Sequence, residues 1–191
     1  MNKNILLIYT GGTIGMNSSE NGYVPQKGFL QELLKELHVL RNEKMPKWEL
    51  IELDPLLDSS NVTVCEWNKI GAIINENYDK FDGFVILHGT DTMAYTASAL
   101  SFTLENLSKP VVITGSQIPL FEVRSDGLDN LVTAMMVAAE GRVNEVALCF
   151  GKKLIRGNRA TKISTSNLNA FSSPKRSRRR RFRATKRPPD F

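Results

Sequence analysis

The chain has 191 residues, of which 41% are hydrophobic and 24% are charged, and this ordinary globular composition excludes a collagen-like, low-complexity or mostly disordered chain. The net charge of +5 is unevenly distributed, because residues 174–191 contain nine basic residues and one acid. The first 173 residues contain 16 basic and 19 acidic residues and carry a net charge of −3. A mildly acidic body therefore precedes a basic segment of net charge +8.

The sequence shows no pattern for export, membrane insertion or metal binding. The apolar run Ile5–Tyr9 is too short for a secretory signal, and Thr10-Gly11-Gly12 ends it. No apolar stretch approaches the roughly 18 residues that a membrane span needs. Cys65 and Cys149 lie far apart and form no disulfide framework, so we expect buried thiols in a reducing compartment. Neither histidine has a partner at ligand spacing, and no zinc site is predicted.

Strand-like and helix-like hydrophobic periods alternate along the body. Short continuous apolar runs predict strands buried on both faces, whereas apolar residues three and four positions apart predict helices that bury one face. Thr63, with Glu66 three residues later, is a capping-box pattern that predicts a helix start. The predicted elements in chain order are a strand at Asn4–Tyr9, a polar loop to about Lys27, a helix over 29–37, a strand at Trp48–Leu53, a helix from Thr63 to about Tyr78, a strand at Phe84–Leu87, a helix from Asp91 or Thr92 to about Asn106, a strand at Pro110–Thr114, a helix from Ser125 or Asp126 through Ala139, and a strand at Val146–Phe150.

This alternation of strands and helices predicts the fold class. Strands that alternate with helices form parallel sheets through right-handed crossover connections. We therefore expect an α/β fold with an open, mainly parallel sheet and helices on both faces. The sequence contains no internal repeat, and its apolar density falls after Asn158.

Three of the predicted strands end in clusters of glycine and hydroxyl residues, at Thr10–Gly15, His88–Thr92 and Thr114–Gln117. Ligands of open parallel sheets bind beyond the carboxyl ends of the strands, so these clusters predict one site at one edge. None of them matches a phosphate-binding or nucleophile-elbow signature, which disfavours a nucleotide site. A pocket of hydroxyl groups with one carboxylate, Asp91, predicts a hydroxyl nucleophile and acyl transfer.

Each of these residues also has an ordinary structural explanation. A threonine or aspartate directly after a strand is commonly the N-cap of the next helix. His88 is expected to order a turn rather than to take part in chemistry. The three clusters together, rather than any single residue, favour a functional site.

Two long motifs resemble the signatures of L-asparaginases, in the form of the bacterial cytoplasmic (type I) enzymes. These are Thr10-Gly11-Gly12-Thr13-Ile14-Gly15 and the segment from His88 to Ala99, which begins His88-Gly89-Thr90-Asp91-Thr92. The resemblance covers about residues 3–174 and implies a flavodoxin-like or Rossmann-like N-terminal domain. Three further segments fit the same family, namely Thr114–Pro119, Arg124–Gly127 and Arg156–Lys162.

The resemblance implies hydrolysis of L-asparagine to L-aspartate and ammonia without a metal or organic cofactor. By motif position, Thr13 is the nucleophile that forms an acyl-enzyme ester, and Thr90, Asp91 and Lys162 form a second catalytic group. A threonine hydroxyl is a poor nucleophile without a base and a fixed geometry. A partly desolvated lysine near a carboxylate can exchange a proton with a hydroxyl. Backbone N–H groups around Gly89 and Thr90 are our hypothesis for the oxyanion site.

Further residues match the substrate-binding parts of the family. Asp58-Ser59-Ser60 resembles the substrate-clamping loop, and Asp91 would meet the α-amino group of the substrate. Tyr23 resembles the tyrosine of a mobile lid whose closure excludes water from the ester. The ordinary alternative for Tyr23 is an aromatic residue on a surface loop.

The family also implies parts that this sequence does not show. We expect an asparaginase N-terminal catalytic domain at 1–173 and a basic tail at 174–191 that cannot bury a core, with the smaller second domain of the family absent. A reading-frame shift or truncated gene model explains an abrupt change in composition, and the alternative is a natural basic tail for nucleic acid or an acidic surface. The resemblance further implies homo-oligomers in the cytoplasm. The competing functions are a catalytically silent fragment and a non-specific nucleic-acid binder.

Overall fold

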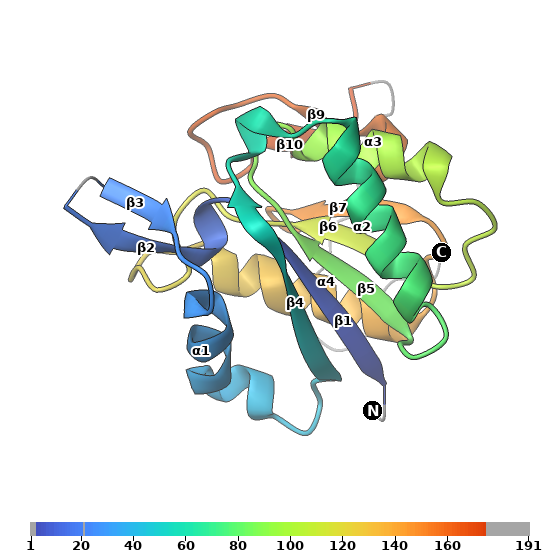
Figure 1. The fold of residues 1–191 in the computed structure, drawn as a ribbon, viewed down its shortest axis with the longest axis horizontal. Helices are drawn as coiled ribbons and strands as arrows, with labels where there is room; N and C mark the ends of the chain where they lie inside the picture. Colours follow the sequence, from blue (N-terminus) through green and yellow to red (C-terminus); the bar gives the residue numbers. More distant parts are fainter. Residues whose placement is uncertain (1–2, 21, 175–191) are drawn as a thin grey trace.

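The structure is a computed structural model that describes residues 3–20 and 22–174. Its main sheet has six strands in the order β4-β1-β5-β6-β7-β8 (Figure 1). The first five of these strands are parallel, and β8 runs antiparallel to β7. The strands of this sheet are β1 (Asn4–Gly11), β4 (Lys47–Leu57), β5 (Gly83–Leu87), β6 (Val111–Thr114), β7 (Val146–Phe150) and β8 (Lys153–Arg156).

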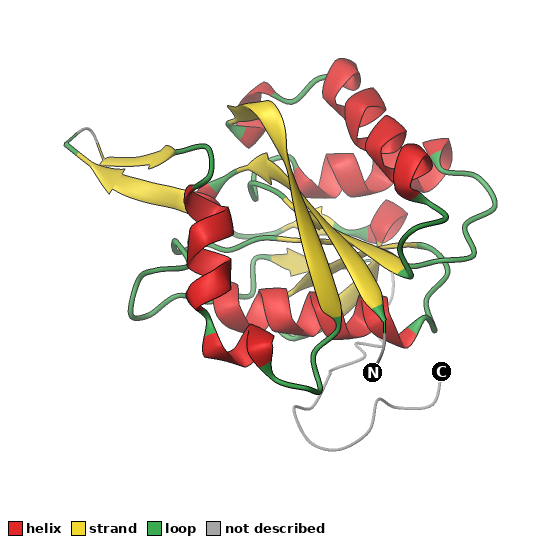
Figure 2. Ribbon diagram, turned by 60° about the horizontal axis from the view of Figure 1, so that its bottom comes forward, coloured by secondary structure: helices red, strands yellow, loops and turns green. Residues whose placement is uncertain are grey.

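Helices cover both faces of this sheet, as Figure 2 shows. Successive residues of a strand point to opposite faces, so Ile5 and Leu7 of β1 pack with α1 and α4, whereas Leu6 and Ile8 pack with α2 and α3. The predicted α/β fold, with an open, mainly parallel sheet between two helical layers, is confirmed. The helices are α1 (Phe29–Glu36), α2 (Val64–Asn77), α3 (Met93–Thr103) and α4 (Gly127–Glu140).

The segment predicted as a polar loop contains an antiparallel hairpin of β2 (Met16–Ser19) and β3 (Gly22–Pro25). It projects from one side of the body in Figure 1. Most of its residues are exposed, so its strands have no buried face that would produce an alternating hydrophobic pattern. The prediction of a loop was therefore wrong for the residues that form this hairpin.

The predicted capping interactions are found at the start of α2 but not at the start of α3. Thr63 and Glu66 form both hydrogen bonds of the predicted capping box at the start of α2. Thr92 lies at the N-cap position of α3, but its hydroxyl donates to the Ser59 carbonyl instead of capping the helix. Helix α3 ends at Thr103, three residues before the predicted Asn106.

After β8 the chain folds back toward the carboxyl edge of the sheet. A short 3-10 helix, Gly157–Arg159, leads to β9 (Thr161–Lys162), which pairs with β10 (Phe171–Ser172). This return places residue 162 beside loops that precede it by about seventy positions. In the part of the chain that the structure describes, no helix has the length and apolar character to cross a membrane. The predicted basic tail lies outside the described residues, apart from Pro174.

Candidate active site

The loops that follow β1 and β5 lie against each other at the carboxyl edge of the sheet. Gly12 has φ +89°, and a Cβ atom there would lie 2.4 Å from the Cα and N atoms of Gly89. This close approach requires glycine, because any side chain would collide with the neighbouring backbone. It places the loop of Thr13 directly beside the loop of Thr90.

The turn after β4 completes the same edge. A Cβ atom on Gly89 would lie 2.5 Å from the Ser59 hydroxyl oxygen, so this loop also depends on a glycine. The Asp91 N–H donates to Ser59 Oγ at 3.3 Å, and Thr92 Oγ1 donates to the Ser59 carbonyl at 2.6 Å. The structure therefore brings three loops together from β1, β4 and β5.

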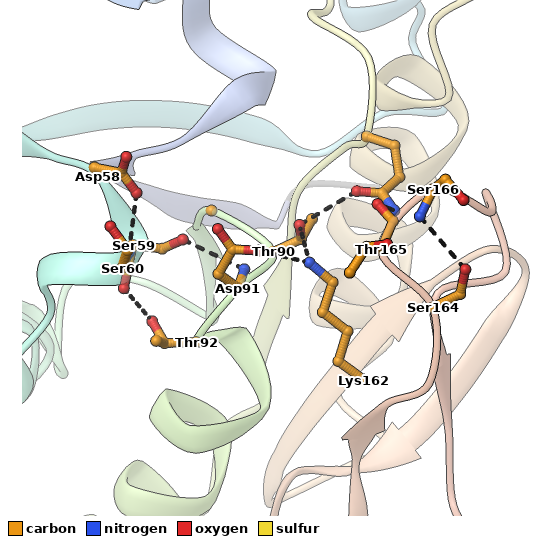
Figure 3. A network of polar contacts seen from close by, with 12 residues as sticks. Asp58, Ser59, Ser60, Thr90, Asp91, Thr92, Lys162, Ser164, Thr165 and Ser166 are labelled. Atoms are coloured by element: carbon orange, nitrogen blue, oxygen red, sulfur yellow. Dashed lines mark hydrogen bonds and ion pairs between the residues drawn. The ribbon is translucent and has the colours of Figure 1, made fainter.

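Lys162 joins this edge through two polar contacts. Its Nζ atom donates to Thr90 Oγ1 at 2.9 Å and pairs with Asp91 Oδ1 at 2.7 Å. The Lys162 side chain is 16% exposed, whereas that of Asp91 is 62% exposed. Figure 3 shows Thr90 and Asp91 between Lys162 on one side and Asp58–Ser60 on the other. The arrangement can move a proton between an amine and a hydroxyl and still offer a carboxylate to a cationic ligand.

Gln117 is a site residue that the sequence did not identify by role. The Thr90 hydroxyl accepts from Lys162 and donates to Gln117 Oε1 at 3.2 Å. The Gln117 amide in turn donates to the Thr165 carbonyl at 3.0 Å, and both carboxylate oxygens of Asp126 accept its backbone N–H. Gln117 lies just after the end of β6, in the predicted cluster Thr114–Gln117, and this position was the sequence feature that could have indicated a role in the site.

Two of the predicted site residues stand apart from this hydrogen-bond network. Thr13 is half-buried in a short 3-10 helix, and its hydroxyl makes no hydrogen bond to the described residues. The Tyr23 hydroxyl, on β3, donates to Glu122 at 2.9 Å, and its ring packs edge-on against Phe121. The hydrogen bond to Glu122 raises the pKa of Tyr23 above its usual value. The structure thus joins Thr90, Asp91 and Lys162 and shows no hydrogen bond from Thr13 or Tyr23 to them among the described residues.

The residues predicted to form the substrate clamp lie on the opposite side of Asp91 from Lys162 (Figure 3). The Asp58 carboxylate accepts the Ser60 N–H at 2.9 Å and shapes this turn. Ser59 is buried between the turn and the β5 loop, while Asp58 and Ser60 are exposed. Across residues 3–20 and 22–174, no group of three His, Cys, Asp or Glu residues could hold a metal ion.

Comparison with known proteins identifies the family. A sequence model described as "Asparaginase, N-terminal" matches residues 4–187 and so extends past Pro174. The chain belongs to the asparaginase family. It is similar to "L-asparaginase 1" of Escherichia coli (strain K12), with 55% identity over 172 residues, 90% of this chain and 51% of the relative. It is also 42% identical to a mouse "60 kDa lysophospholipase" over 90% of this chain and 34% of that relative.

A solved structure supports the same assignment. L-asparaginase I from Vibrio cholerae superposes with a TM-score of 0.84 and 52% identity, covering 91% of this chain and 52% of that chain. The asparaginase resemblance predicted from the two motifs is therefore confirmed. The chain spans about half the length of its E. coli relative. It spans 34% of the length of the mouse relative. The catalytic roles of individual residues stay predictions.

Proposed function

We propose that the chain is the catalytic N-terminal part of an L-asparaginase of the cytoplasmic type I form, and that it hydrolyses L-asparagine to L-aspartate and ammonia without a cofactor. The observation that supports this function best is the contact of the Lys162 amine with both Thr90 and Asp91. A lysine held on a hydroxyl and a carboxylate is the proton-exchanging group that a threonine acyl transfer needs.

In the proposed first step the Thr13 oxygen attacks the side-chain amide carbon of asparagine. The C–N bond of the amide breaks, the hydroxyl proton leaves with the nitrogen as ammonia, and a threonine ester forms. In the second step water attacks the ester carbon while the Thr90–Lys162 pair takes up a water proton. The Thr13 oxygen then regains a proton and aspartate is released. The Asp91 carboxylate stabilises the lysine while it carries that proton.

Substrate binding is assigned from exposure and free hydrogen-bonding capacity. The exposed Asp91 carboxylate is available to the α-ammonium group of asparagine. The Ser59 hydroxyl accepts from the Asp91 N–H, so its own proton is free for the α-carboxylate. Ser60, in the turn shaped by Asp58, lines the same side, and Tyr23 is proposed to cover the bound substrate from β3.

Location in the cytoplasm and assembly into homo-oligomers belong to the same proposal, which rests on the type I resemblance. Helix α3 carries apolar side chains on all sides, and Tyr95 and Phe102 are 68% and 71% exposed. Exposed aromatic residues on one helix favour a surface that another chain or domain covers. This supports an assembly in which α3 is not exposed to water.

The test is ammonia release from L-asparagine by the 191-residue chain, both alone and fused to the remaining half of the E. coli relative. We expect Thr13→Ala to lower the rate by about 10³-fold or more, because the substitution removes the proposed nucleophile. Thr133→Ala is the matched control, since the Thr133 hydroxyl only binds a carbonyl within α4.

Three results would contradict the proposal. The first is equal rates for Thr13→Ala and the wild type. The second is a folded but inactive fusion, which would favour the silent-fragment alternative. The third is faster cleavage of a lysophospholipid ester than of asparagine, a comparison suggested by the name of the mouse relative.

A further inference from the structure

A chain of hydrogen bonds reaches the candidate site from the protein interior. Trp67 Nε1 on α2 lies 3.0 Å from Thr96 Oγ1 on α3. The same Thr96 oxygen lies 3.0 Å from His88 Nε2, and His88 Nδ1 lies 2.7 Å from the Gly89 carbonyl oxygen. The hydrogen-bond chain thus joins three side chains from different elements and ends at one peptide group of the β5 loop.

For a neutral imidazole, the two ends of this chain fix the direction of every proton in it. An indole N–H can only donate and a carbonyl oxygen can only accept. Thr96 therefore accepts from Trp67 and donates to His88 Nε2, which leaves the His88 proton on Nδ1 facing the Gly89 carbonyl. His88 and Thr96 are fully buried, and burial lowers the pKa of His88 below its usual value. The imidazole is consequently neutral, with one tautomer selected by its neighbours.

The peptide group at the end of the chain is the one that joins Gly89 to Thr90. Its carbonyl oxygen accepts from His88, and its N–H belongs to Thr90. A hydrogen bond on the oxygen of an amide polarises the group and makes its N–H a stronger donor. Thr90 is buried, yet none of the described residues accepts its N–H. Buried backbone N–H groups are normally paired, so this donor is available to a ligand next to the Thr90 hydroxyl.

We propose that His88 is a positioning residue, and that the Trp67–Thr96–His88 chain holds and polarises the Gly89–Thr90 peptide so that the Thr90 N–H binds the oxygen that becomes negative during acyl transfer. This rests on the proposed function. His88 acts through the peptide and does not touch the substrate. Preorganised donors of this kind stabilise the transition state more than the bound substrate.

The ordinary alternative is that His88 is a hydrogen-bonded core residue with no effect on chemistry. A substitution at Thr96 distinguishes these two roles of His88, because Thr96 is two hydrogen bonds away from the peptide. Thr96→Val keeps the shape of the side chain and removes the hydroxyl. A purely structural role predicts lower stability alone, whereas a positioning role predicts a change at the Thr90 N–H.

The first measurement is ¹⁵N NMR of the full chain, whose two histidines make the His88 signals easy to assign. We expect the wild-type imidazole to be the neutral Nδ1–H tautomer. In Thr96→Val the Nδ1 proton and the Thr90 amide proton should both move to lower frequency, and Thr96→Ser should restore them. Thr103→Val on the same helix is the control, because its hydroxyl only binds the Ala99 carbonyl.

The second measurement is the kinetics of asparagine hydrolysis by the fusion used above. We expect Thr96→Val to lower kcat by about 10- to 100-fold, less than the loss of a whole oxyanion donor, with KM changed by less than about two-fold because ground-state binding is spared. An unmoved Thr90 amide, a protonated or Nε2–H imidazole in the wild type, or an unchanged kcat would each overturn the proposal.

The proposal can also fail separately from the proposed function. If the wild type releases no ammonia, the assigned function fails, and addition of L-aspartate still tests the Thr90 donor. We expect L-aspartate to shift the Thr90 amide in the wild type and to shift it less in Thr96→Val. Shifts confined to Asp91 and Lys162 would overturn the assignment.

Discussion

The two sides of the candidate site are built by different physical means. On one side, Thr90, Asp91, Lys162 and Gln117 are joined by hydrogen bonds and one ion pair. On the other side, the Thr13 loop is placed by the steric fit of Gly12 against Gly89, and its hydroxyl has no partner among the described residues. The side proposed to exchange protons is thus held by side-chain contacts, whereas the loop of the proposed nucleophile is held by glycine packing and by the Tyr9 hydroxyl, which donates to the Gly12 carbonyl at 3.2 Å. Changes to the side chains of the first side should affect proton transfer, whereas changes to the glycine packing of the second should affect the fold.

Apart from removal of the Thr13 hydroxyl, the largest expected effect is that of Lys162→Met. The substitution removes the only amine that contacts Thr90 in the described part of the chain while keeping an unbranched side chain of similar length. We expect the rate of ammonia release to fall by about 10²- to 10⁴-fold, the range of general acid–base catalysis, with little change in the urea midpoint.

Lys3→Met provides the matched control. Lys3 forms a lysine–aspartate pair with Asp82 at 2.7 Å, the same distance as the pair of Lys162 with Asp91. It lies at the start of β1, at the opposite edge of the sheet. Equal losses of activity in both variants would mean that the Lys162 contact is an ordinary surface ion pair.

The next effect concerns the glycine packing that places Thr13. Gly12 and Gly22 have similar φ values, +89° and +93°, but a Cβ atom meets the Gly89 backbone at Gly12 and nothing within 4 Å at Gly22. Both alanine variants place a Cβ atom at a positive φ, which costs about 1–3 kcal/mol. Gly12→Ala should lose a further ~1–3 kcal/mol through overpacking.

Urea unfolding of the two variants measures this difference directly. Because both variants carry the strain of a positive φ, the difference in their stability reports mainly the steric contribution of the Gly12–Gly89 contact. If both variants lose the same stability, the Thr13 loop is not held against the Thr90 loop as described.

How well each region could be predicted from the sequence depends on which physical interaction forms it. The buried strands, such as β5, were predictable because burial on both faces selects continuous apolar runs. The β2–β3 hairpin was missed because its pairing is made by backbone atoms between mostly exposed residues. The hydrophobic pattern contains no information on such a pairing, and the Asn21-Gly22 dipeptide of the sequence was the available turn signal.

The site was predictable in part for similar reasons. Thr90 and Asp91 follow a recognisable buried strand, so their place at the sheet edge could be derived. Lys162 is 72 positions from Thr90 and arrives through the return of the chain after β8, so only the family resemblance indicated it. The role of Gln117 depends on its contact with Thr90 and was not indicated by spacing.

The smallest expected effect lies at the exposed hairpin. The Tyr23 hydroxyl donates its proton to Glu122, which raises its pKa above the usual value near 10. The folded protein therefore favours the neutral phenol, so the contact persists below about pH 10 and is lost as the pH rises through the raised pKa. The ultraviolet absorbance of tyrosinate, taken as the difference between wild type and Tyr23→Phe, measures this transition. Glu122→Ala should return the transition toward pH 10, and an unchanged transition would show that Glu122 does not hold the hairpin.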